Sequence, residues 1–489
     1  MNQKLLMISG DRSLASGKRG AFYNTLEELS KHFERIDVIT PRSTGNENIL
    51  FGNVHLYPSP WSLWRQPWWI LKKGTQIFRE VKFDAITVHD YAPFYNGLGA
   101  NWLAERTRVP FMLEIHHIPG YPKAGSFKEL IYRYLSWRFL AADARRARVI
   151  RVVNQYQTKK FLSSAGIPES KLRYIPSMYI DLDVFKPAEA EKKYDLISVA
   201  RLEANKGTLE LIKAVELLKK SRPEIILAVV GDGSLKKSLE KYVHEHGLTE
   251  NVKFLGWLGD SQALAGAYRS TKVFVNPSRN EGGPRVALEA MACGTPVVTT
   301  RVGLMLDIIR DHENGFFCGW SPEEIARTLS SVLADDKLRE TRGHNGLETA
   351  AQFERKSAIA NYASTINDLV KKRLLIITQK VDSHDDLLGF FPSWIKEFSK
   401  HCEKVEVIAF SAGEYDLPSN VQVHSLGKDK GDSKLKQGMR MLNLLGRYVP
   451  ESDAVFAHMS PIFAIIAWPF TFYFGKKLIL WYLHRSKTF

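Results

Sequence analysis

The stretch Ile225-Ile226-Leu227-Ala228-Val229-Val230-Gly231-Asp232-Gly233 decides the fold of the middle of this chain. An unbroken apolar run that ends in a Gly-Asp-Gly turn is typical of a strand buried on both faces. A second such run lies upstream at residues 196–200, and the apolar spacing of residues 208–220 between them predicts a helix. A strand, a helix and another buried strand in this order predict a parallel sheet covered by helices on both faces.

The same alternation extends over the first 372 residues. Residues 21–33 have the spacing of a helix, and the segment near residues 287–292 begins another after a Gly-Gly-Pro turn. Further buried strands are expected at residues 5–9, 36–40, 85–88, 111–115, 149–153, 273–276 and 296–300. We therefore predict two α/β domains, residues 1–187 and 188–372, joined by a charged hinge at about 186–193 and closed by a helix at about 356–370.

The third segment, residues 373–489, repeats the beginning of the chain. Its apolar runs at 374–378 and 405–410 match those at 5–9 and 36–40, and the segment 392–401 matches the first helix. Residues 478–484 match 112–116, which pairs His484 with His116, and Gly389 lies near the start of the repeated first helix. We expect an incomplete copy of the first domain, with no second copy of residues 188–372.

Composition excludes several classes of protein. The chain has 489 residues, of which 44% are hydrophobic and 25% charged, as in ordinary globular domains. Its three cysteines, Cys293, Cys318 and Cys402, lie far apart, so a disulfide framework or a thiolate zinc site is not expected and a reducing cytoplasm fits best. The apolar runs at 5–8 and 462–475 are too short for a signal peptide or for a membrane span of roughly 18 residues.

The net charge is +15, and most of the basic excess falls in residues 1–187. This asymmetry favours an anionic partner of that domain, either acidic lipid or phosphate groups. Aromatic side chains also mix there with cations, as on surfaces that meet an anionic bilayer. These residues are Trp61, Trp64, Arg65, Trp68, Trp69, Lys72 and Lys73, then Lys128, Tyr132, Arg133, Tyr134, Trp137, Arg138, Phe139, Arg145, Arg146 and Arg148. The alternative is an aromatic core beneath solvated charges; a nucleic-acid partner is not expected, because no known module is present.

Two cations follow the strand at residues 196–200. They are Arg201 and Lys206, in a loop that ends at Gly207 and precedes a helix. Ligands of open parallel sheets bind beyond the carboxyl ends of the strands, where a guanidinium and an ammonium would meet a diphosphate. The alternative is a solvated loop with two ordinary surface cations.

A pair of acids brackets a glycine turn farther along. In Glu281-Gly282-Gly283-Pro284-Arg285-Val286-Ala287-Leu288-Glu289, the glycines let the backbone approach a ligand and the helix start favours anionic oxygens. The first carboxylate can accept hydrogen bonds from sugar hydroxyls and the second from a ribose. The alternative, that both acids only complement the helix dipole, loses weight once Arg201 and Lys206 are considered with them.

These motifs together resemble retaining glycosyltransferases of family 4, which have the GT-B fold. The resemblance covers residues 1–372 and rests on Arg201-x4-Lys206-Gly207, Gly231-Asp232-Gly233, and Glu281-x7-Glu289 followed by Ala-Met-Ala-Cys-Gly-Thr-Pro at 290–296. It implies two Rossmann-like domains facing across a cleft that holds a nucleoside diphosphate sugar, with the third segment as a partial Rossmann-like domain.

The resemblance also implies residue roles. The diphosphate would be held by Arg201 and Lys206, and the nucleoside ribose by Glu289. The transferred sugar would contact Glu281, Gly282 and Gly283. The turn at residues 302–307 departs from the family's Gly-Gly-x-x-Glu pattern, which weakens any role carried to that loop. Ala200 replaces a glycine with little expected effect.

In the first domain the resemblance places a glycine-rich loop at the first helix. Gly20 occupies one of its positions, with Ala21 in place of the second glycine and Lys18 and Arg19 beside it for a phosphate; the alternative is a solvated loop. His116 follows the strand at 111–115 and matches a histidine at the family's reaction centre, so we assign catalytic roles to His116 and Glu281. His117 is adjacent and stays an alternative, as does a purely structural histidine.

The resemblance implies a front-face substitution in which the departing diphosphate helps to accept the acceptor's proton, with cations stabilising the leaving charge. No His/Cys ligand cluster and no Asp-x-Asp pair in a supporting context occurs, so we expect neither a metal nor a cofactor besides the donor.

We therefore predict a cytoplasmic or peripheral-membrane enzyme that moves a hexose from a nucleoside diphosphate sugar to a glycan or lipid-linked acceptor, in the synthesis of cell-surface polysaccharide or glycoconjugates. The alternatives are a GT-B sugar-nucleotide epimerase and a non-catalytic sugar-nucleotide-binding scaffold, because fold alone does not fix function. Donor turnover without acceptor would indicate the first, and donor binding without transfer the second.

Overall fold

The structure is a computed structural model that describes residues 3–482 apart from 13, 18–19 and 44. The chain divides into two compact units, residues 1–366 and 367–489. Unit 1 holds both domains of the predicted cleft, and unit 2 corresponds to the repeated segment.

The first domain is built on an eight-stranded sheet. Its order is β3 (Asn48–Leu50), β4 (Val54–Pro58), β2 (Arg35–Thr40), β1 (Lys4–Ile8), β5 (Ala85–His89), β6 (Phe111–Ile115), β7 (Val149–Val152) and β8 (Leu172–Tyr174). Every pairing is parallel except β3 with β4. The central strands are buried on both faces, as expected from their unbroken apolar runs.

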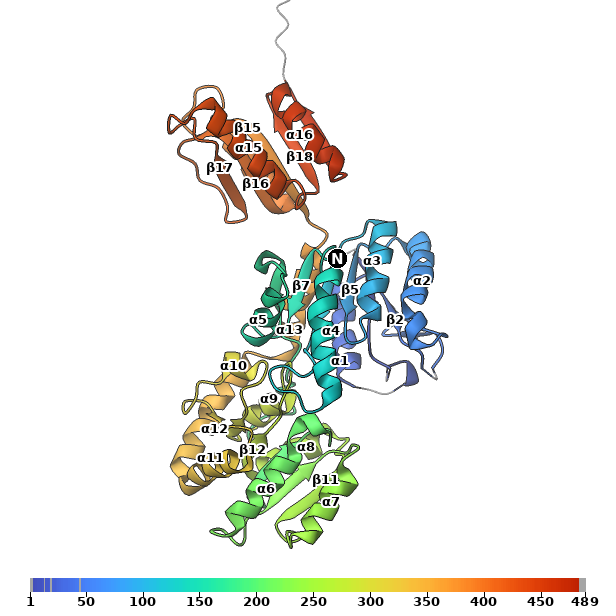
Figure 1. The fold of residues 1–489 in the computed structure, drawn as a ribbon, viewed down its shortest axis with the longest axis vertical. Helices are drawn as coiled ribbons and strands as arrows, with labels where there is room; N and C mark the ends of the chain where they lie inside the picture. The colour runs from blue at the N-terminus through green and yellow to red at the C-terminus, as the bar shows by residue number, and fades with distance from the viewer. Residues whose placement is uncertain (1–2, 13, 18–19, 44, 483–489) are drawn as a thin grey trace, which may run out of the picture. The chain divides into compact units, whose positions relative to one another are not determined.

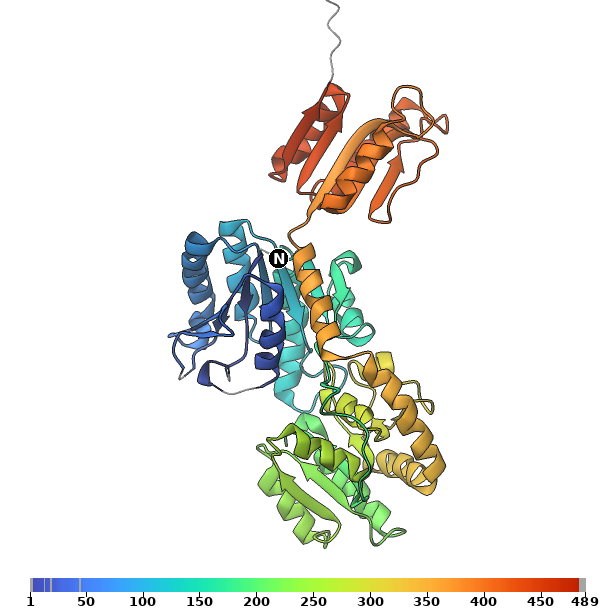
Figure 2. The same ribbon diagram turned by 180° about the vertical axis from the view of Figure 1, so that it is seen from behind.

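Helices cover both faces of this sheet. One face carries α2 (Gln66–Val81), α3 (Tyr95–Thr107), α4 (Phe127–Asp143) and α5 (Gln157–Ser164), whose apolar residues form one core with the strands. The other face carries α1 (Ala21–Leu29) and α13 (Arg355–Asp368), which are seen in front when the molecule is viewed from behind (Figures 1 and 2). The predicted first helix is shorter than expected, because its last residues, Ser30–His32, form a 3-10 turn.

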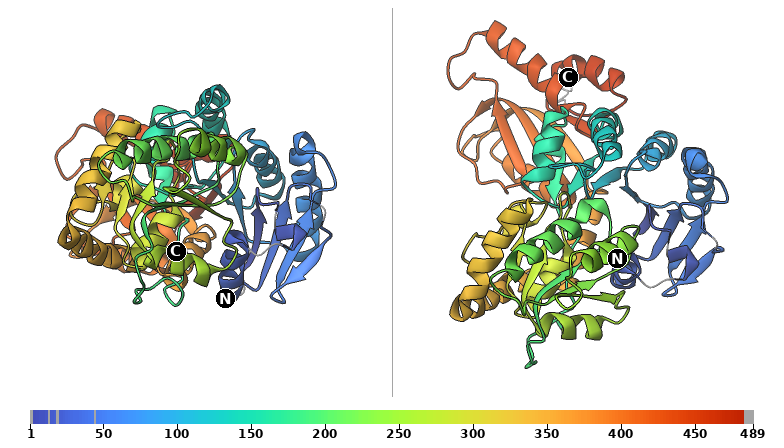
Figure 3. Two further views of the ribbon diagram at one scale, coloured as in Figure 1. Left: turned by 90° about the horizontal axis from the view of Figure 1, so that it is seen from below. Right: turned by 60° about the horizontal axis from the view of Figure 1, so that its bottom comes forward.

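The second domain has a six-stranded parallel sheet. Its order is β11 (Val252–Gly256), β10 (Leu227–Val230), β9 (Tyr194–Val199), β12 (Thr271–Asn276), β13 (Val297–Thr299) and β14 (Phe316–Phe317). One core packs α6 (Thr208–Lys219), α7 (Lys236–Glu245) and α11 (Pro322–Ala334) on one face. The other core holds α8 (Ser261–Arg269), α9 (Arg285–Ala292) and α10 (Met305–Ile308), and α12 (Asp336–Ala351) contacts α9. The strands lie between these two layers of helices (Figure 3).

Unit 2 is a five-stranded parallel sheet with helices on both faces. The strand order is β17 (Val421–Ser425), β16 (Cys402–Ala412), β15 (Lys372–Val381), β18 (Ala454–His458) and β19 (Lys477–Trp481). The helices are α14 (Phe391–His401), α15 (Lys434–Tyr448) and α16 (Pro461–Tyr473). Among the described residues no helix has both the length and the apolar character to cross a bilayer.

The register of this third sheet repeats that of the first. In the first sheet Leu5 lies opposite Ile36 and Ala85, and in the third Leu374 lies opposite Val405 and Ala454 at the same spacings. The order β17-β16-β15-β18-β19 therefore reproduces β4-β2-β1-β5-β6, five adjacent positions of the first sheet. His484 lies outside the described residues.

Candidate functional site

The loop after β9 presents the two predicted cations. It runs through a 3-10 turn, Ala204–Lys206, to Gly207, whose φ of 70° lies in the left-handed region. A Cβ at Gly207 would lie 2.2 Å from the carbonyl oxygen of Pro277, so only glycine fits where this loop crosses the next strand end. The loop leaves Arg201 exposed, while Lys206 is mostly buried.

Lys206 and Glu281, which were both assigned to the donor site, are in contact. The Lys206 Nζ forms an ion pair with the Glu281 carboxylate, and the Ser278 hydroxyl lies 3.2 Å from the same oxygen. The two residues come from loops after different strands, β9 and β12, at the carboxyl edge of one sheet. This edge is where open parallel sheets bind ligands.

The glycine turn that follows Glu281 touches the first domain. A Cβ at Gly282 would lie 1.7 Å from the carbonyl oxygen of His116, and the Asn154 side-chain amide donates a 3.0 Å hydrogen bond to the Gly282 carbonyl. Gly283 packs against Leu304. The predicted reaction-centre histidine and the predicted sugar-binding turn are therefore adjacent in space, although they lie on different domains.

Glu289 lies on the first turns of α9 and is only 8% exposed. The Tyr268 hydroxyl donates a 3.1 Å hydrogen bond to its carboxylate. Burial raises the pKa of Glu289, against a lowering by Arg285 and by the bond from Tyr268. A carboxyl group in this state is suited to accept hydrogen bonds from a neutral diol rather than to pair with a cation.

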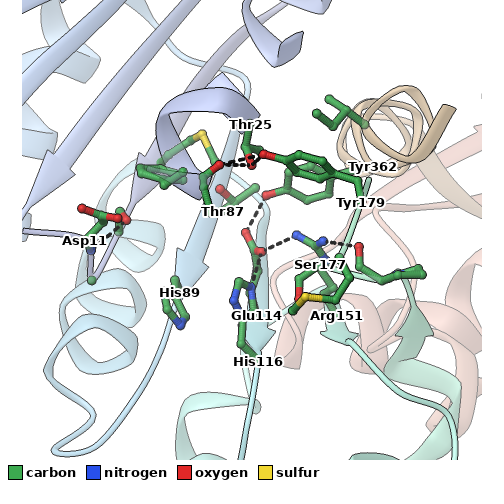
Figure 4. A pocket seen from close by; sticks show the side chains of 18 of the residues that line it. Asp11, Thr25, Thr87, His89, Glu114, His116, Arg151, Ser177, Tyr179 and Tyr362 are labelled. Atoms are coloured by element: carbon green, nitrogen blue, oxygen red, sulfur yellow. Dashed lines mark hydrogen bonds and ion pairs between the residues drawn. The ribbon is translucent and has the colours of Figure 1, made fainter. Parts of the chain in front are cut away.

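His116 directly follows β6 and lines a cavity of about 330 Å³ in the first domain (Figure 4). Its Nε2 lies 3.3 Å from Glu114 Oε2, and its ring stacks on that of His89 with 4.2 Å between the centroids. Burial and the neighbouring His116 lower the pKa of His89 to about 3, so His89 is neutral near pH 7. The cavity extends from His116 to the end of β1, where Asp11 lines it.

His117 also lies against the second domain. Its ring is accessible to solvent, and a Cβ at Gly282 would lie 3.2 Å from the His117 Cβ. Its pKa is lowered, mainly by desolvation among the surrounding protein atoms, with Lys206 and Arg201 also lowering it and Glu281 opposing them. The structure therefore brings both histidines to the cleft. The assignment of the reaction-centre role to His116, with His117 as the alternative, stays a prediction.

Gly20 is the N-cap of α1 and has extended backbone, with no side-chain cap. Its neighbour Ala21 lines the cavity, together with Gly10 from the end of β1. A Cβ at Gly10 would lie 2.3 Å from the ring of Tyr91, so this part of the lining requires glycine. Lys18 and Arg19 lie outside the described residues.

Three residues that line the cavity were not predicted from the sequence: Glu114, Arg151 and Tyr362. Glu114 and Arg151 lie directly opposite each other on β6 and β7 and form a buried ion pair of 2.7 Å. Tyr362 reaches the same carboxylate from α13. The sequence did contain a signal for this pair, because each of two otherwise apolar neighbouring strands carries one charged residue. A buried carboxylate and a buried guanidinium are costly unless they pair with each other.

Further hydrogen bonds join the two domains around the cleft. The Asp307 carboxylate accepts from the backbone N–H groups of Gln155 and Tyr156, at 2.6 and 3.1 Å. The Asn280 side-chain amide donates 3.0 Å bonds to the Lys123 carbonyl and to Glu129. The turn at residues 302–307, to which no ligand role was assigned, thus contributes to the contact between the domains.

Comparison with known proteins fits this arrangement. Residues 21–179 match the family model described as Glycosyltransferase Family 4, and residues 180–349 match Glycosyl transferases group 1. The sulfoquinovosyl transferase of Arabidopsis thaliana is 28% identical over 366 residues, which cover 70% of this chain and 69% of that protein. A D-inositol 3-phosphate glycosyltransferase of Paenarthrobacter aurescens is 32% identical over 213 residues, 40% of this chain and 52% of that protein.

Solved structures share the fold of unit 1. Sucrose-phosphate synthase from Thermosynechococcus elongatus superposes with a TM-score of 0.64 at 19% identity, covering 75% of this chain and 99% of that one. The Anabaena protein HepE, solved in complex with UDP and glucose, gives a TM-score of 0.59 at 19% identity and covers 75% of this chain and all of that one. Residues 21–349 of this chain therefore belong to the glycosyltransferases of the group 1 and family 4 type, with a GT-B fold.

Proposed function

We propose that residues 1–372 form a retaining, metal-independent hexosyltransferase that uses a nucleoside diphosphate sugar. The observation that carries the proposal is the meeting of Glu281 with Lys206 on one side and of Gly282 with the His116 carbonyl on the other. A sugar diphosphate lying along this line would place its phosphates at Arg201 and Lys206 and its sugar at Glu281 and the following glycine N–H groups. Cations at the leaving diphosphate would stabilise the charge that develops there.

The acceptor is proposed to enter from the first domain. The cavity beneath His116 lies next to the sugar end of that line, and both apolar and hydroxyl-bearing side chains form its walls. A glycan or the headgroup of a lipid-linked acceptor could place one hydroxyl beside His116, which would hydrogen-bond the transferring sugar. We place this chemistry in the synthesis of cell-surface polysaccharide or glycoconjugates.

The test is product detection by mass spectrometry with a panel of sugar nucleotides and glycan and lipid-linked acceptors. Glu281→Ala should lose transfer, and the product's anomeric coupling in ¹H NMR should match that of the donor. Full transfer by Glu281→Ala would contradict the site, and an inverted anomer would contradict retention. Donor turnover without acceptor would indicate an epimerase, and binding without turnover a scaffold. Activity that is lost in EDTA and restored by a divalent cation would overturn metal independence.

We further propose that the face of the first domain that carries α2, α3 and α4 binds an anionic membrane surface. Figure 1 shows that these helices are adjacent. Large apolar side chains are exposed on them and on the 3-10 turn Leu63–Arg65 that precedes α2. They are Trp64, Trp68, Leu98, Leu130, Ile131, Tyr134, Trp137 and Phe139. Exposed cations accompany them: Arg65, Lys72, Lys128 and Arg138. Exposed aromatic side chains mixed with cations suit the headgroup region of an anionic bilayer.

The four tryptophans that the sequence grouped together differ in their exposure to solvent. Trp61 and Trp69 contact each other edge to face, and Trp69 packs on the core, whereas Trp64 and Trp68 are 55% and 49% exposed. Flotation with phosphatidylglycerol vesicles should carry the wild-type chain, and the double variant Trp64→Ser/Trp68→Ser should float less. Leu435→Ser, which removes an exposed apolar side chain on α15, is the control. Equal flotation with zwitterionic vesicles, or none with either, would contradict the proposal.

Unit 2 is proposed to be an incomplete repeat of the acceptor-side domain without activity of its own. The residue at the end of β18, His458, occupies the position that His89 has at the end of β5. His458 is fully buried, with the ring of Phe391 stacked on it at 3.6 Å and its Nδ1 3.0 Å from the Thr378 hydroxyl. Aromatic packing thus fills the place that in unit 1 borders the cavity. Transfer activity in purified residues 373–489 would overturn this view.

A further inference from the structure

Helix α13 brings a side chain from the chain segment after the second domain into the cavity of the first. Ala358, Ile359 and Tyr362 line that cavity, on the face opposite to α2–α4. The start of the helix is fixed by backbone hydrogen bonds of Ile180 with Phe353 and Arg355, at 2.7 and 3.0 Å. Tyr362 is therefore held at a defined depth in the first domain.

The Tyr362 hydroxyl contacts the Glu114 carboxylate, which also contacts His116. Its hydroxyl donates a 2.7 Å hydrogen bond to Glu114 Oε1, while Glu114 Oε2 accepts from Arg151 at 2.7 Å and lies 3.3 Å from His116 Nε2 (Figure 4). Burial alone would raise the pKa of Glu114, but Arg151, His116 and Tyr362 hold it well below its usual range. The carboxylate is therefore ionised and can only accept hydrogen bonds.

An acceptor-only partner selects one tautomer of the neighbouring imidazole. For His116 Nε2 to bond Glu114, Nε2 must carry the proton, and in the neutral ring Nδ1 is then the hydrogen-bond acceptor. We propose that Tyr362 is a positioning residue for His116: by fixing the Glu114 carboxylate from α13, it keeps the His116 ring in the Nε2–H tautomer. The inference rests on the proposed function, because it gives His116 its orientation at the reaction centre.

The ring of Tyr362 has a contact of its own, which a variant can keep when the hydroxyl is removed. The Arg151 guanidinium carbon lies 4.0 Å from the centroid of the Tyr362 ring. In Tyr362→Phe this stacking stays, while the hydroxyl group is lost together with its hydrogen bond to Glu114 and its hydrogen-bond contact with Thr87. The variant thus changes the hold on the carboxylate without opening a cavity in the core.

A matched control exists on the second domain. The Tyr242 hydroxyl donates a hydrogen bond of the same length, 2.7 Å, to the Glu216 carboxylate between α7 and α6, outside the cleft. Tyr242→Phe removes the same chemical group from the same kind of partner. Tyr242→Phe therefore shows the effect of losing such a bond outside the cleft, at a less buried tyrosine.

The experiment compares kinetics and ring tautomers in the full chain. Tyr362→Phe should lower kcat roughly tenfold, the factor expected for one hydrogen bond to a charged group, with the KM of the donor unchanged. Tyr242→Phe should leave both unchanged. An unchanged kcat in Tyr362→Phe, or a rise in donor KM that accounts for the whole loss, would overturn the inference.

The second readout does not depend on activity. In ¹⁵N-histidine NMR spectra, with the His116 resonances assigned from a His116→Gln spectrum, the wild-type ring should show the Nε2–H pattern. Tyr362→Phe should add the Nδ1–H form, and Glu114→Gln, whose amide can donate, should favour it. A wild-type Nδ1–H ring, or one unaffected by Tyr362→Phe, would overturn the proposal. If no sugar is transferred, the proposed function fails, and the spectra still decide the role of Tyr362.

Discussion

Gly282 lies against the backbone carbonyl of His116, with room for a hydrogen atom and nothing larger between them. This contact joins the sugar-binding turn of one domain to the reaction-centre strand of the other. Any side chain at position 282 must push the two domains apart at the point where the transferred sugar is proposed to lie.

We therefore expect Gly282→Ala to lower kcat/KM roughly ten- to a hundredfold, because a Cβ at 1.7 Å from a backbone oxygen costs a shift of main chain rather than of a flexible side chain. Steady-state kinetics measure the loss. Gly266→Ala on α8 is the control, since a Cβ there meets no atom within 4 Å. Equal activity of the two variants would contradict the close contact.

Arg201 tests the diphosphate site without disturbing the fold. Its side chain is exposed, so Arg201→Ala should leave the melting temperature unchanged. Loss of one charge-assisted contact should raise the Kd of the nucleoside diphosphate roughly ten- to a hundredfold, measured by calorimetry with whichever of UDP, GDP or ADP stabilises the wild type most. Arg222→Ala, at a half-buried position after α6, should bind as the wild type does. Unchanged affinity in Arg201→Ala would remove this residue from the site.

A buried pair of carboxyl groups makes stability depend on pH. Asp90 and Asp143 lie side by side beneath α3, where a Cβ at Gly97 would lie 2.5 Å from one and 2.7 Å from the other. Burial raises the pKa of both groups, and for Asp143 the neighbouring Asp90 raises it further. Stability should therefore be complete below the pKa of an unfolded aspartate and should fall as pH rises through the raised folded values.

Asp143→Asn removes the titration of Asp143 and leaves that of Asp90, and its amide can donate to the buried Asp90 Oδ2. We expect the variant to melt roughly 2–4 °C above the wild type at pH 8.5 and to differ less at pH 5.5. Thermal unfolding at the two pH values measures this. Asp183→Asn, at an exposed aspartate, should follow the wild type at both. A variant that loses the same stability as the wild type between pH 5.5 and 8.5 would refute the pair.

Deletion of residues 373–489 should leave transfer activity within a factor of about two, because unit 1 contains all the residues assigned to the cleft. The cut falls after α13, so Tyr362 and its contacts are kept. Kinetics of the purified shorter chain decide the point. Loss of all activity would show that the third segment contributes to the site.

The sequence predicted those parts of the molecule that depend on local pattern. Strand β10 is a continuous apolar run, and β9 and β12 each contain a short apolar core. Lys206 and Glu281 were both placed at one edge of this parallel sheet, although their ion pair was not predicted. The hairpin of β3 with β4 was missed, because these strands are short and partly exposed and so lack the continuous apolar run that marks a buried strand.

The cavity network could not be predicted in the same way. Tyr362 and Glu114 are 248 residues apart, and no local pattern links a helix near the end of one domain to a strand in the other. Only the pairing register of β6 with β7 shows that Glu114 and Arg151 neutralise each other. The roles implied for all the site residues stay predictions: Gly20, His116, His117, Arg201, Lys206, Glu281, Gly282, Gly283 and Glu289.

The repeated register of the first and third sheets has a consequence for how the chain folds. Strand β1 pairs with β2, and β15 pairs with β16 in the equivalent register. Because the two pairs are so similar, β15 could also pair with β2, and β1 with β16. During refolding from denaturant the two units can exchange these strands and form long-lived misassembled species, a hazard of chains with similar domains. Synthesis on the ribosome avoids this, because the first sheet is complete before the second copy emerges.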